Sequence, residues 1–333
     1  MNKILVTGSG GQLGSDLVVA LRQRYGATQV IESGRSPPAK ASLFPHELLD
    51  VRDRIHLQNL IEQYQIKTIF HLAGLLSAKG EQHPDLCWNI NIDGLRNVLE
   101  AAKVYGLRVF WPSSIAVFGP HTPKVDTPQI TVEDPATMYG ITKVTGELLC
   151  HYYAQRFGVD VRSLRFPGII SYNAPPGGGT TDFAVEIFYA ALQHGTYTCF
   201  VRPETRLPMM YMPDAIRAIL NLMQTDPASI KIRSSYNVAA VSFSAEELVA
   251  AIQKHLPKFT CRYQPDFRQA IADSWPTTID DSQARADWGW QHTYALPAIV
   301  EDMLTKLSYR SLQNPKLEIQ KVASITSLNQ FPG

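Results

Sequence analysis

The stretch that decides the fold lies near the N-terminus and reads KILVTGSGGQLG over residues 3–14. Its first five residues favour a strand with the apolar centre Ile4-Leu5-Val6, and a helical pattern begins near residue 11. Gly8 permits a tight turn after the strand, Gly11 leaves room for a phosphate beside the backbone, and Gly14 lets helix and strand pack closely. Because a helix N-terminus also offers free N–H groups and the positive end of its dipole, we expect a dinucleotide-binding loop here.

The rest of the first half alternates short apolar runs with amphipathic stretches. Strands are predicted at residues 2–7, 29–33, 67–73, 107–112 and 159–166, and helices near 11–25, 53–64, 87–106 and 137–157. This alternation is typical of β-α-β units, so we predict an α/β fold with a doubly wound parallel sheet of the Rossmann type. The runs at 68–73 and 108–111 lack polar alternation, which indicates strands buried on both faces.

Beyond residue 166 the pattern is looser. Further helices are predicted near 182–194, 213–224, 244–254 and 294–307, with a strand at 234–239. We predict a dinucleotide-binding Rossmann domain at 1–166 and a smaller C-terminal α/β substrate-binding part at 167–308, some of whose elements return to the first domain. Residues 309–333 are polar and weakly patterned, and we expect a peripheral tail.

The composition excludes several classes of function. Lys and Arg together number 31 and Asp and Glu 30, so the chain has no basic surplus for nucleic acid or an anionic membrane. No apolar run is long enough to span a bilayer, and the strand at the N-terminus leaves no room for a targeting peptide. The four cysteines are far apart and match neither a zinc site nor a disulfide framework. We therefore expect a cytoplasmic protein that holds no metal.

The ribose of the cofactor should be recognised at the end of the second strand, where the sequence is Glu32-Ser33-Gly34-Arg35. NAD enzymes usually place an acidic residue there, but the expected position is Gly34. Because Gly34 carries no carboxylate and Arg35 follows it, this position would accept the 2′-phosphate of NADP. If a bulge shifted the strand, Glu32 would instead be the acidic residue that binds the ribose of NAD. These residues leave NAD and NADP as alternatives.

Two later strand ends complete the predicted cofactor groove. Asp50 and Val51 follow the second unit, and Asp50 either holds the adenine amino group or caps the helix that begins near Arg52. Ala73 and Gly74 end a strand with small residues that let a ribose pass close by. The predicted cofactor-binding residues are Gly8, Gly11, Gln12, Leu13, Gly14, Gly34, Arg35, Asp50, Val51, Leu72, Ala73, Gly74, Asn91, Tyr139, Lys143, Phe166 and Ile169.

A catalytic constellation is predicted on the helix that begins near residue 137. Tyr139 and Lys143 are four residues apart and therefore share one helix face. A free tyrosine is a poor base at neutral pH, but a lysine ammonium and a positive nicotinamide ring would both lower its pKa. Lys143 would also bind the nicotinamide ribose. Ser114 ends the preceding strand and would hold the reacting oxygen against Tyr139, so these three residues are the predicted catalytic set.

Together these motifs resemble the extended short-chain dehydrogenase/reductase superfamily over about residues 2–308. The matching stretches are Thr7-Gly8-x-x-Gly11-x-x-Gly14, Asn91-Ile92-Asp93-Gly94, Ser114–Gly119 and Tyr139-x-x-x-Lys143. The resemblance implies an oxidoreductase and a homodimer in which the helices near 87–106 and 140–157 pair with their symmetry mates. The apolar stripe taken to support this dimer comprises Leu95, Val98, Leu99 and Ala102.

Other residues indicate a branch of the superfamily. Dehydratases carry an Asp-Glu pair where this chain has Ile115 and Ala116, and sugar-nucleotide enzymes usually show an asparagine where it has Gly168. The runs at 111–119, 165–168, 176–182 and 210–214 instead resemble the short-chain type of L-threonine 3-dehydrogenase. That resemblance implies zinc-independent oxidation of L-threonine to 2-amino-3-oxobutanoate in amino-acid catabolism, with NAD as the cofactor. A nucleotide-sugar epimerase or reductase is the alternative.

The physical chemistry of the glycine-rich loop also suits a small amino-acid substrate. Residues 177–179 can expose successive backbone N–H groups, and Thr180 and Thr181 add hydroxyls at a helix start, which together would hold a carboxylate. The alternative is a loop in which Thr181 or Asp182 simply caps the helix. The predicted substrate-binding residues are Ser77, Ser114, Tyr139, Gly179, Thr180, Thr181 and Trp275. A non-catalytic NAD(P) sensor on the same fold would be expected to lack the tyrosine or the lysine.

Overall fold

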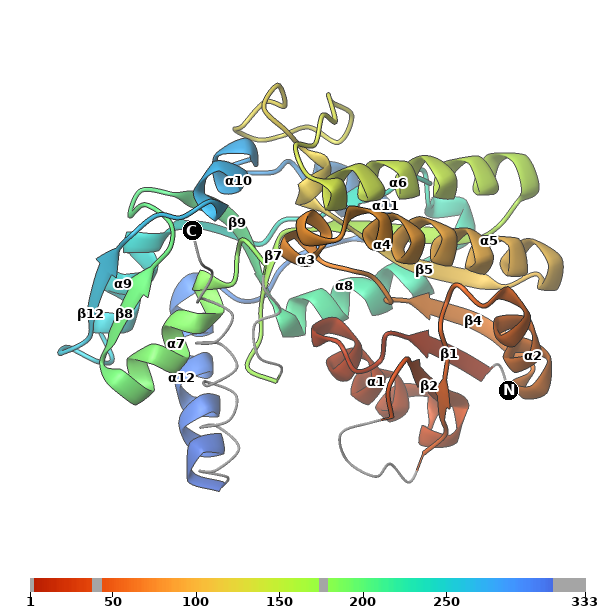
Figure 1. The fold of residues 1–333 in the computed structure, drawn as a ribbon, viewed down its shortest axis with the longest axis horizontal. Helices are drawn as coiled ribbons and strands as arrows, with labels where there is room; N and C mark the ends of the chain where they lie inside the picture. The colour runs from red at the N-terminus through yellow and green to blue at the C-terminus, as the bar shows by residue number, and fades with distance from the viewer. Residues whose placement is uncertain (1–2, 38–43, 174–178, 314–333) are drawn as a thin grey trace.

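The computed structural model describes residues 3–37, 44–173 and 179–313. Its centre is a seven-stranded sheet in the order β10-β6-β5-β4-β1-β2-β3, and every neighbouring pair is parallel (Figure 1). The strands are β1 (Lys3–Thr7), β2 (Val30–Gly34), β3 (His46–Leu48), β4 (Ile66–His71), β5 (Arg108–Ser114), β6 (Val161–Phe166) and β10 (Tyr236–Asn237). The predicted doubly wound α/β fold is confirmed.

Helices cover both faces of this sheet because successive residues of a buried strand point to opposite sides. On one face, Ile4 and Val6 share a core with residues of α1 and α8; on the other, Leu5 shares a core with residues of α2, α5 and α6. These helices are α1 (Gln12–Tyr25), α8 (Met212–Gln224), α2 (Arg54–Tyr64), α5 (Gly94–Tyr105) and α6 (Met138–Phe157). The carboxyl ends of the strands therefore meet along one edge, between the two helical layers.

After β6 the chain builds a second group of elements, with a three-stranded sheet β11-β9-β7 and a two-stranded sheet β12-β8. Its strands are β7 (Gly168–Ile170), β8 (Thr196–Cys199), β9 (Arg206–Tyr211), β11 (Val241–Ser244) and β12 (Thr260–Tyr263). Its helices are α7 (Phe183–His194), α9 (Ala245–Gln253), α10 (Arg268–Ser274) and α12 (Leu296–Gln313), whereas α11 (Ser282–Trp288) packs against β10 of the large sheet. The domain division at residue 166 stays a prediction, and most of the expected tail lies outside the described residues.

One segment joins the two groups at the edge that matters for function. Residues 115–118 directly follow β5 and include the short 3₁₀ turn η3 (Ile115–Val117). They are buried in the core of the second group, together with Phe183, Phe188 and Tyr211. The residue at the end of β5, Ser114, is therefore placed where the two groups meet.

The predicted helix at 87–106 is divided into three parts: α4 (Pro84–Trp88), a π-helical turn η2 (Asn89–Asp93) and α5. A short helix α3 (Ser77–Gln82) precedes them. The prediction that the apolar stripe of α5 forms a dimer face is wrong, because its four residues are at most 2% exposed and belong to the core under α5. The homodimer itself stays a prediction, and α6 exposes other apolar side chains for it, namely Ile141, Leu148 and Tyr152.

Candidate active site

A groove follows the carboxyl edge of the large sheet and consists of two neighbouring cavities. Both are lined by Gly8, Gly11, Leu72, Gly74 and Leu75. The first cavity is also lined by Gly34, Arg35, Leu49, Asp50, Val51, Ala73 and Ile90. The second cavity is also lined by Gln12, Leu13, Gly14, Leu76, Ser77, Pro112, Ser113, Ser114, Tyr139, Lys143, Phe166, Pro167, Gly168, Ile169, Gly179, Thr180, Thr181, Asp182 and Trp275. Every predicted site residue except Asn91 therefore lines this groove.

Several lining residues were not predicted from the sequence. Leu75, Leu76, Pro112, Ser113 and Pro167 directly flank predicted positions at strand ends, so extending each predicted stretch by two residues would have included them. Leu49 and Ile90 also line the first cavity. No motif marks either residue, but Leu49 directly precedes Asp50 and Ile90 directly precedes Asn91, so the same extension would have included them.

The glycine loop has the geometry that a dinucleotide phosphate requires. Gly8 has a φ of +70°, and a Cβ there would lie 2.7 Å from the backbone nitrogen of Ala73. A Cβ on Gly14 would lie 2.4 Å from the carbonyl oxygen of Gly8, so neither position accepts a side chain. No side chain of the described residues caps the N-terminus of α1, which begins directly after Gly11. Its first N–H groups are left for an anion, which fits the pyrophosphate of a dinucleotide.

Glu32 does not serve as a ribose-binding acid here. β2 pairs with β1 without a shift in register, so the bulge that this alternative needs does not occur. The Glu32 carboxylate lies 2.6 Å from the guanidinium of Arg22 on α1. Gly34 and Arg35 line the first cavity instead. The alternative that assigned the ribose to Glu32 is therefore wrong, and Arg35 is the basic side chain at this end of the groove.

Asp50 lines the first cavity as an ionised acceptor and not as a helix cap. The cap of α2 is Asp53, whose carboxylate accepts a hydrogen bond from the His56 N–H at 2.9 Å. The Arg52 guanidinium donates to the Asp50 carboxylate at 2.6 Å and holds the pKa of Asp50 below its usual value. The capping alternative for Asp50 is therefore wrong.

Asn91 lies behind the groove and supports its wall. Its Oδ1 accepts from the Leu75 N–H at 2.7 Å, and its Nδ2 donates to the Leu75 carbonyl at 3.1 Å and to the Thr142 hydroxyl at 3.0 Å. Both ends of the amide are therefore engaged by the protein. Because Leu75 lines both cavities, Asn91 shapes the place where they join and does not line it.

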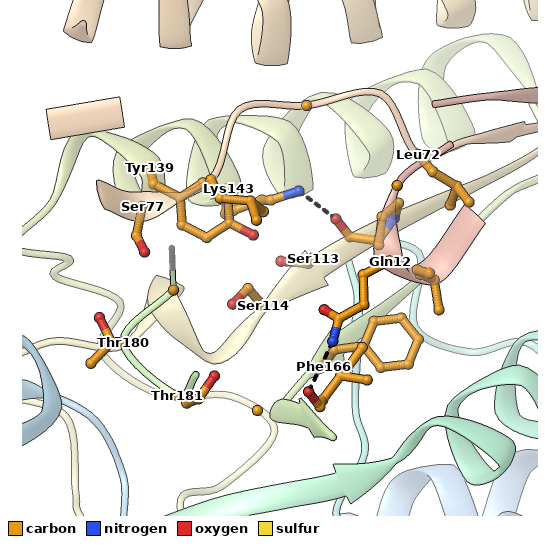
Figure 2. A pocket seen from close by; sticks show the side chains of 18 of the residues that line it. Gln12, Leu72, Ser77, Ser113, Ser114, Tyr139, Lys143, Phe166, Thr180 and Thr181 are labelled. Carbon is orange, nitrogen blue, oxygen red and sulfur yellow. Dashed lines mark hydrogen bonds between the residues drawn. The ribbon is translucent and has the colours of Figure 1, made fainter. Parts of the chain in front are cut away.

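A helix cap and one close backbone contact bring Tyr139 beside Ser114. Thr137 caps α6 through its hydroxyl, which accepts from the Gly140 N–H at 3.0 Å. A Cβ on Gly140 would lie only 2.2 Å from the carbonyl oxygen of Ala116, so α6 packs directly on the segment that follows Ser114. Figure 2 shows the side chains of Ser114 and Tyr139 in the second cavity, with Lys143 next to them. The predicted catalytic residues are thus brought together from β5 and α6.

Burial dominates the ionisation of these groups. It raises the pKa of Tyr139 to about 12, which a hydrogen bond with Ser114 opposes in part. It also lowers the pKa of Lys143 to about 8. The Lys143 ammonium donates to the Pro112 carbonyl at 2.6 Å and lies 5.3 Å from the centre of the Tyr139 ring. The lowering of the tyrosine pKa was predicted with a positive nicotinamide ring beside it and stays a prediction; in the protein alone, burial of the ring raises that pKa.

A buried polar network supports the strands beneath Lys143. Glu147 lies one turn further along α6, accepts from the Ser113 hydroxyl at 2.5 Å and pairs with Arg165 at 2.6 Å. Arg165 also pairs with Glu133, whose pKa is raised to about 7 by burial and by the charge of Glu147. The network links β5, β6 and α6, so it fixes the elements that carry the catalytic residues.

The second group of elements supplies the other wall of the second cavity. Thr180, Thr181 and Trp275 line it, and Ser77 reaches it from α3 (Figure 2). The Gly179 N–H donates to the Asp182 carboxylate at 2.7 Å, so the expectation that this group is free to bind a substrate carboxylate is wrong. Gly177 and Gly178, part of the same expectation, lie outside the described residues. The threonine hydroxyls are the remaining candidates for that contact.

Neither a metal-binding cluster nor a membrane-spanning helix occurs in residues 3–37, 44–173 and 179–313. In these ranges no three His, Cys, Asp or Glu side chains form a group that could hold a metal ion. No helix in the same part of the chain is long and apolar enough to cross a membrane.

Comparisons with known proteins agree with this geometry. A family model described as "NAD dependent epimerase/dehydratase family" matches residues 4–239. The chain is 48% identical over 314 residues to a Staphylococcus aureus protein described as an uncharacterized epimerase/dehydratase, covering 93% of this chain and 98% of that protein.

Solved structures are similar over nearly the whole chain. A GalE-like L-threonine dehydrogenase from Cupriavidus necator in its holo form is 52% identical with a TM-score of 0.90, covering 92% of this chain and 99% of that one. An L-threonine dehydrogenase from Phytophthora infestans is 52% identical with a TM-score of 0.91, covering 93% and 100%. A nucleoside-diphosphate-sugar epimerase from Agrobacterium tumefaciens, at 22% identity and a TM-score of 0.79, shares the fold alone.

Proposed function

The chain belongs to the NAD dependent epimerase/dehydratase family, within the extended short-chain dehydrogenase/reductase superfamily, and from this premise we propose that it is an L-threonine 3-dehydrogenase. It would oxidise the β-hydroxyl of L-threonine to give 2-amino-3-oxobutanoate, with NAD as the hydride acceptor and without zinc. The observation that carries the proposal is the second cavity, where Tyr139, Ser114 and Lys143 face Thr180 and Thr181 next to the glycine loop. Solved proteins of that name at about the same length support it.

The chemistry divides between the cofactor and the chain. NAD, when bound, supplies the hydride acceptor for the hydrogen on the β-carbon. Tyr139, as phenolate, takes the proton of the β-hydroxyl while the C–O single bond becomes a carbonyl. Ser114 donates to the same oxygen and keeps it in reach of Tyr139. The Lys143 ammonium would hold the nicotinamide ribose and stabilise the phenolate, which burial otherwise disfavours.

The amino-acid end of the substrate would lie against the second group of elements. The Thr180 and Thr181 hydroxyls would bind the carboxylate, with Ser77 and Trp275 completing the wall. Thr180 is 2% exposed, so a polar ligand that reaches it must leave water and be matched by hydrogen bonds. A substrate without the carboxylate should therefore be a poor one.

The dehydratase branch of the family is disfavoured by the residues next to Ser114. An acid that protonates a departing hydroxyl is needed there, but the side chains are Ile115 and Ala116, which are 2% and 1% exposed in the apolar core. Neither can transfer a proton. The geometry thus favours simple alcohol oxidation.

The test is a cofactor-reduction assay at 340 nm with L-threonine, D-threonine, L-serine and 3-hydroxybutanoate, each with NAD and with NADP. We expect L-threonine with NAD to give the highest kcat/KM, since it carries both the carboxylate and the correctly placed hydroxyl. EDTA should leave the rate unchanged, because the described residues hold no cluster of metal ligands. No reduction with L-threonine would refute the substrate, and a loss with EDTA that zinc restores would refute the metal-free mechanism.

A further inference from the structure

Gly168 stands at an unusually crowded point of the second cavity. It opens β7 and pairs with Met209 of β9, whose side chain is fully buried. A Cβ built on Gly168 would lie 2.4 Å from the Met209 sulfur and 2.8 Å from both Cβ and Cγ2 of Thr181. Its backbone needs no glycine for conformational reasons, because its φ lies outside the left-handed region. Space alone therefore requires glycine here.

The contact with Thr181 cannot be relieved by rotating a side chain. Rotation about χ1 moves Cγ2 of Thr181 but leaves its Cβ in place, so a methyl group on Gly168 must displace the backbone of Thr181. That backbone is anchored to α7, since the Thr181 carbonyl accepts from the Ala184 N–H at 3.1 Å. The start of α7 therefore packs directly against β7, and it can do so because Gly168 has no side chain.

Both residues line the cavity that holds the catalytic groups. In the view of Figure 2, Ser114 lies between Tyr139 and Thr181, and all three line this cavity. We infer that Gly168 is a specificity-determining residue: its bare surface seats Thr181 and so limits the substrate end of the cavity to a small β-hydroxy amino acid. This inference rests on the proposed function and adds to it the element that sets substrate size.

The first experiment is a double-mutant cycle on kcat/KM for L-threonine. Gly168→Ala should lower it by roughly tenfold to 100-fold, mostly through KM, because the Thr181 hydroxyl is moved from its place. Thr181→Ser keeps the hydroxyl and removes the crowded Cγ2, so alone it should cost no more than about threefold. In the double variant the contact with Cγ2 is gone, while those with Cβ of residue 181 and with the Met209 sulfur remain, so only part of the Gly168→Ala loss, about threefold, should be recovered.

The second experiment measures selectivity. Thr181→Ser opens space above Gly168, so the ratio of kcat/KM for (2S,3R)-2-amino-3-hydroxypentanoate to that for L-threonine should rise about tenfold, as for one methylene group. NADH affinity, measured by fluorescence titration, should stay within about twofold in Thr181→Ser, because Thr181 is not among the predicted cofactor-binding residues, whereas Gly168 lies between Phe166 and Ile169, which are.

The outcomes separate this inference from the proposed function. Losses that simply add in the double variant, or an unchanged substrate ratio in Thr181→Ser, would overturn the role of the pair even if the wild-type protein oxidises L-threonine. A wild-type protein without L-threonine activity would overturn the proposed function itself, and the specificity role with it. If Gly168→Ala fails to fold, the Thr181→Ser substrate ratio still tests whether Thr181 sets substrate size, and an unchanged ratio overturns the inference.

Discussion

Replacing Lys143 with methionine should lower turnover strongly. It should also remove a pH-dependent loss of folding stability that the buried ammonium causes in the wild-type protein. Lys143 is 7% exposed, and its ammonium is held by one carbonyl and by the face of the Trp111 ring at 4.5 Å. Methionine has nearly the same length but no charge to keep in a buried place. Losing the group that stabilises the phenolate should lower kcat/KM at least about 100-fold.

The effect on stability follows from the two pKa values of the lysine. Burial lowers the pKa of Lys143 to about 8 in the folded protein, against the usual 10.5 in the unfolded chain. Between these values the unfolded chain binds more protons, so the free energy of unfolding rises with pH. The neutral side chain of Lys143 therefore contributes its full share to the free energy of unfolding above pH 10.5, and this contribution is lost as the pH falls through 8. Its full span is about 3 kcal/mol, of which about 2 kcal/mol falls between pH 7 and pH 9.5.

The assay is urea unfolding of the wild-type protein and Lys143→Met at several pH values from 7 to 9.5. The difference in unfolding free energy should change by about 2 kcal/mol in favour of the wild type as the pH rises. Tyr139, whose pKa is raised to about 12, does not interfere in this range. Lys67→Met is the matched control, because Lys67 is exposed on β4, and its difference should stay flat. Parallel curves for wild type and Lys143→Met would refute the argument.

Three further predictions concern the site and the assembly. Tyr139→Phe should lower turnover by roughly 100-fold to 10,000-fold while NADH binding, followed by fluorescence, is unchanged; near-normal turnover would remove the tyrosine from the mechanism. NAD should be the preferred cofactor, and if Arg35 binds a 2′-phosphate, Arg35→Ala should raise the KM for NADP alone about tenfold. Equal effects on both cofactors would exclude that contact, and a tenfold wild-type preference for NADP would overturn the choice of NAD. Light scattering should show a dimer at micromolar concentration that Leu148→Glu, on the exposed face of α6, dissociates; a monomeric wild type would contradict it.

The fold and most of the groove could be predicted because they depend on rules that act over a few residues. Gly8 and Gly14 are required by a turn and by one helix–strand contact, both within the same short stretch. The spacing of Tyr139 and Lys143 places them on one helix face whatever surrounds the helix. The strands β3, β7, β8, β11 and β12 have only three or four residues and were not predicted, since such short runs carry too little periodicity to be recognised. β9, which contains Pro208, was not predicted either.

What the sequence by itself determined is the kind of chemistry: a loop for a dinucleotide, and a tyrosine, a lysine and a serine at the edge of a parallel sheet. Only the tertiary structure decided which polar groups remain free, because partners far apart in the sequence compete for them. It places Glu32 against Arg22, gives the Gly179 N–H to Asp182 and seats Thr181 on Gly168. It also raises the pKa of Tyr139 in the protein alone, since the loss of water around a buried ring depends on everything packed against it.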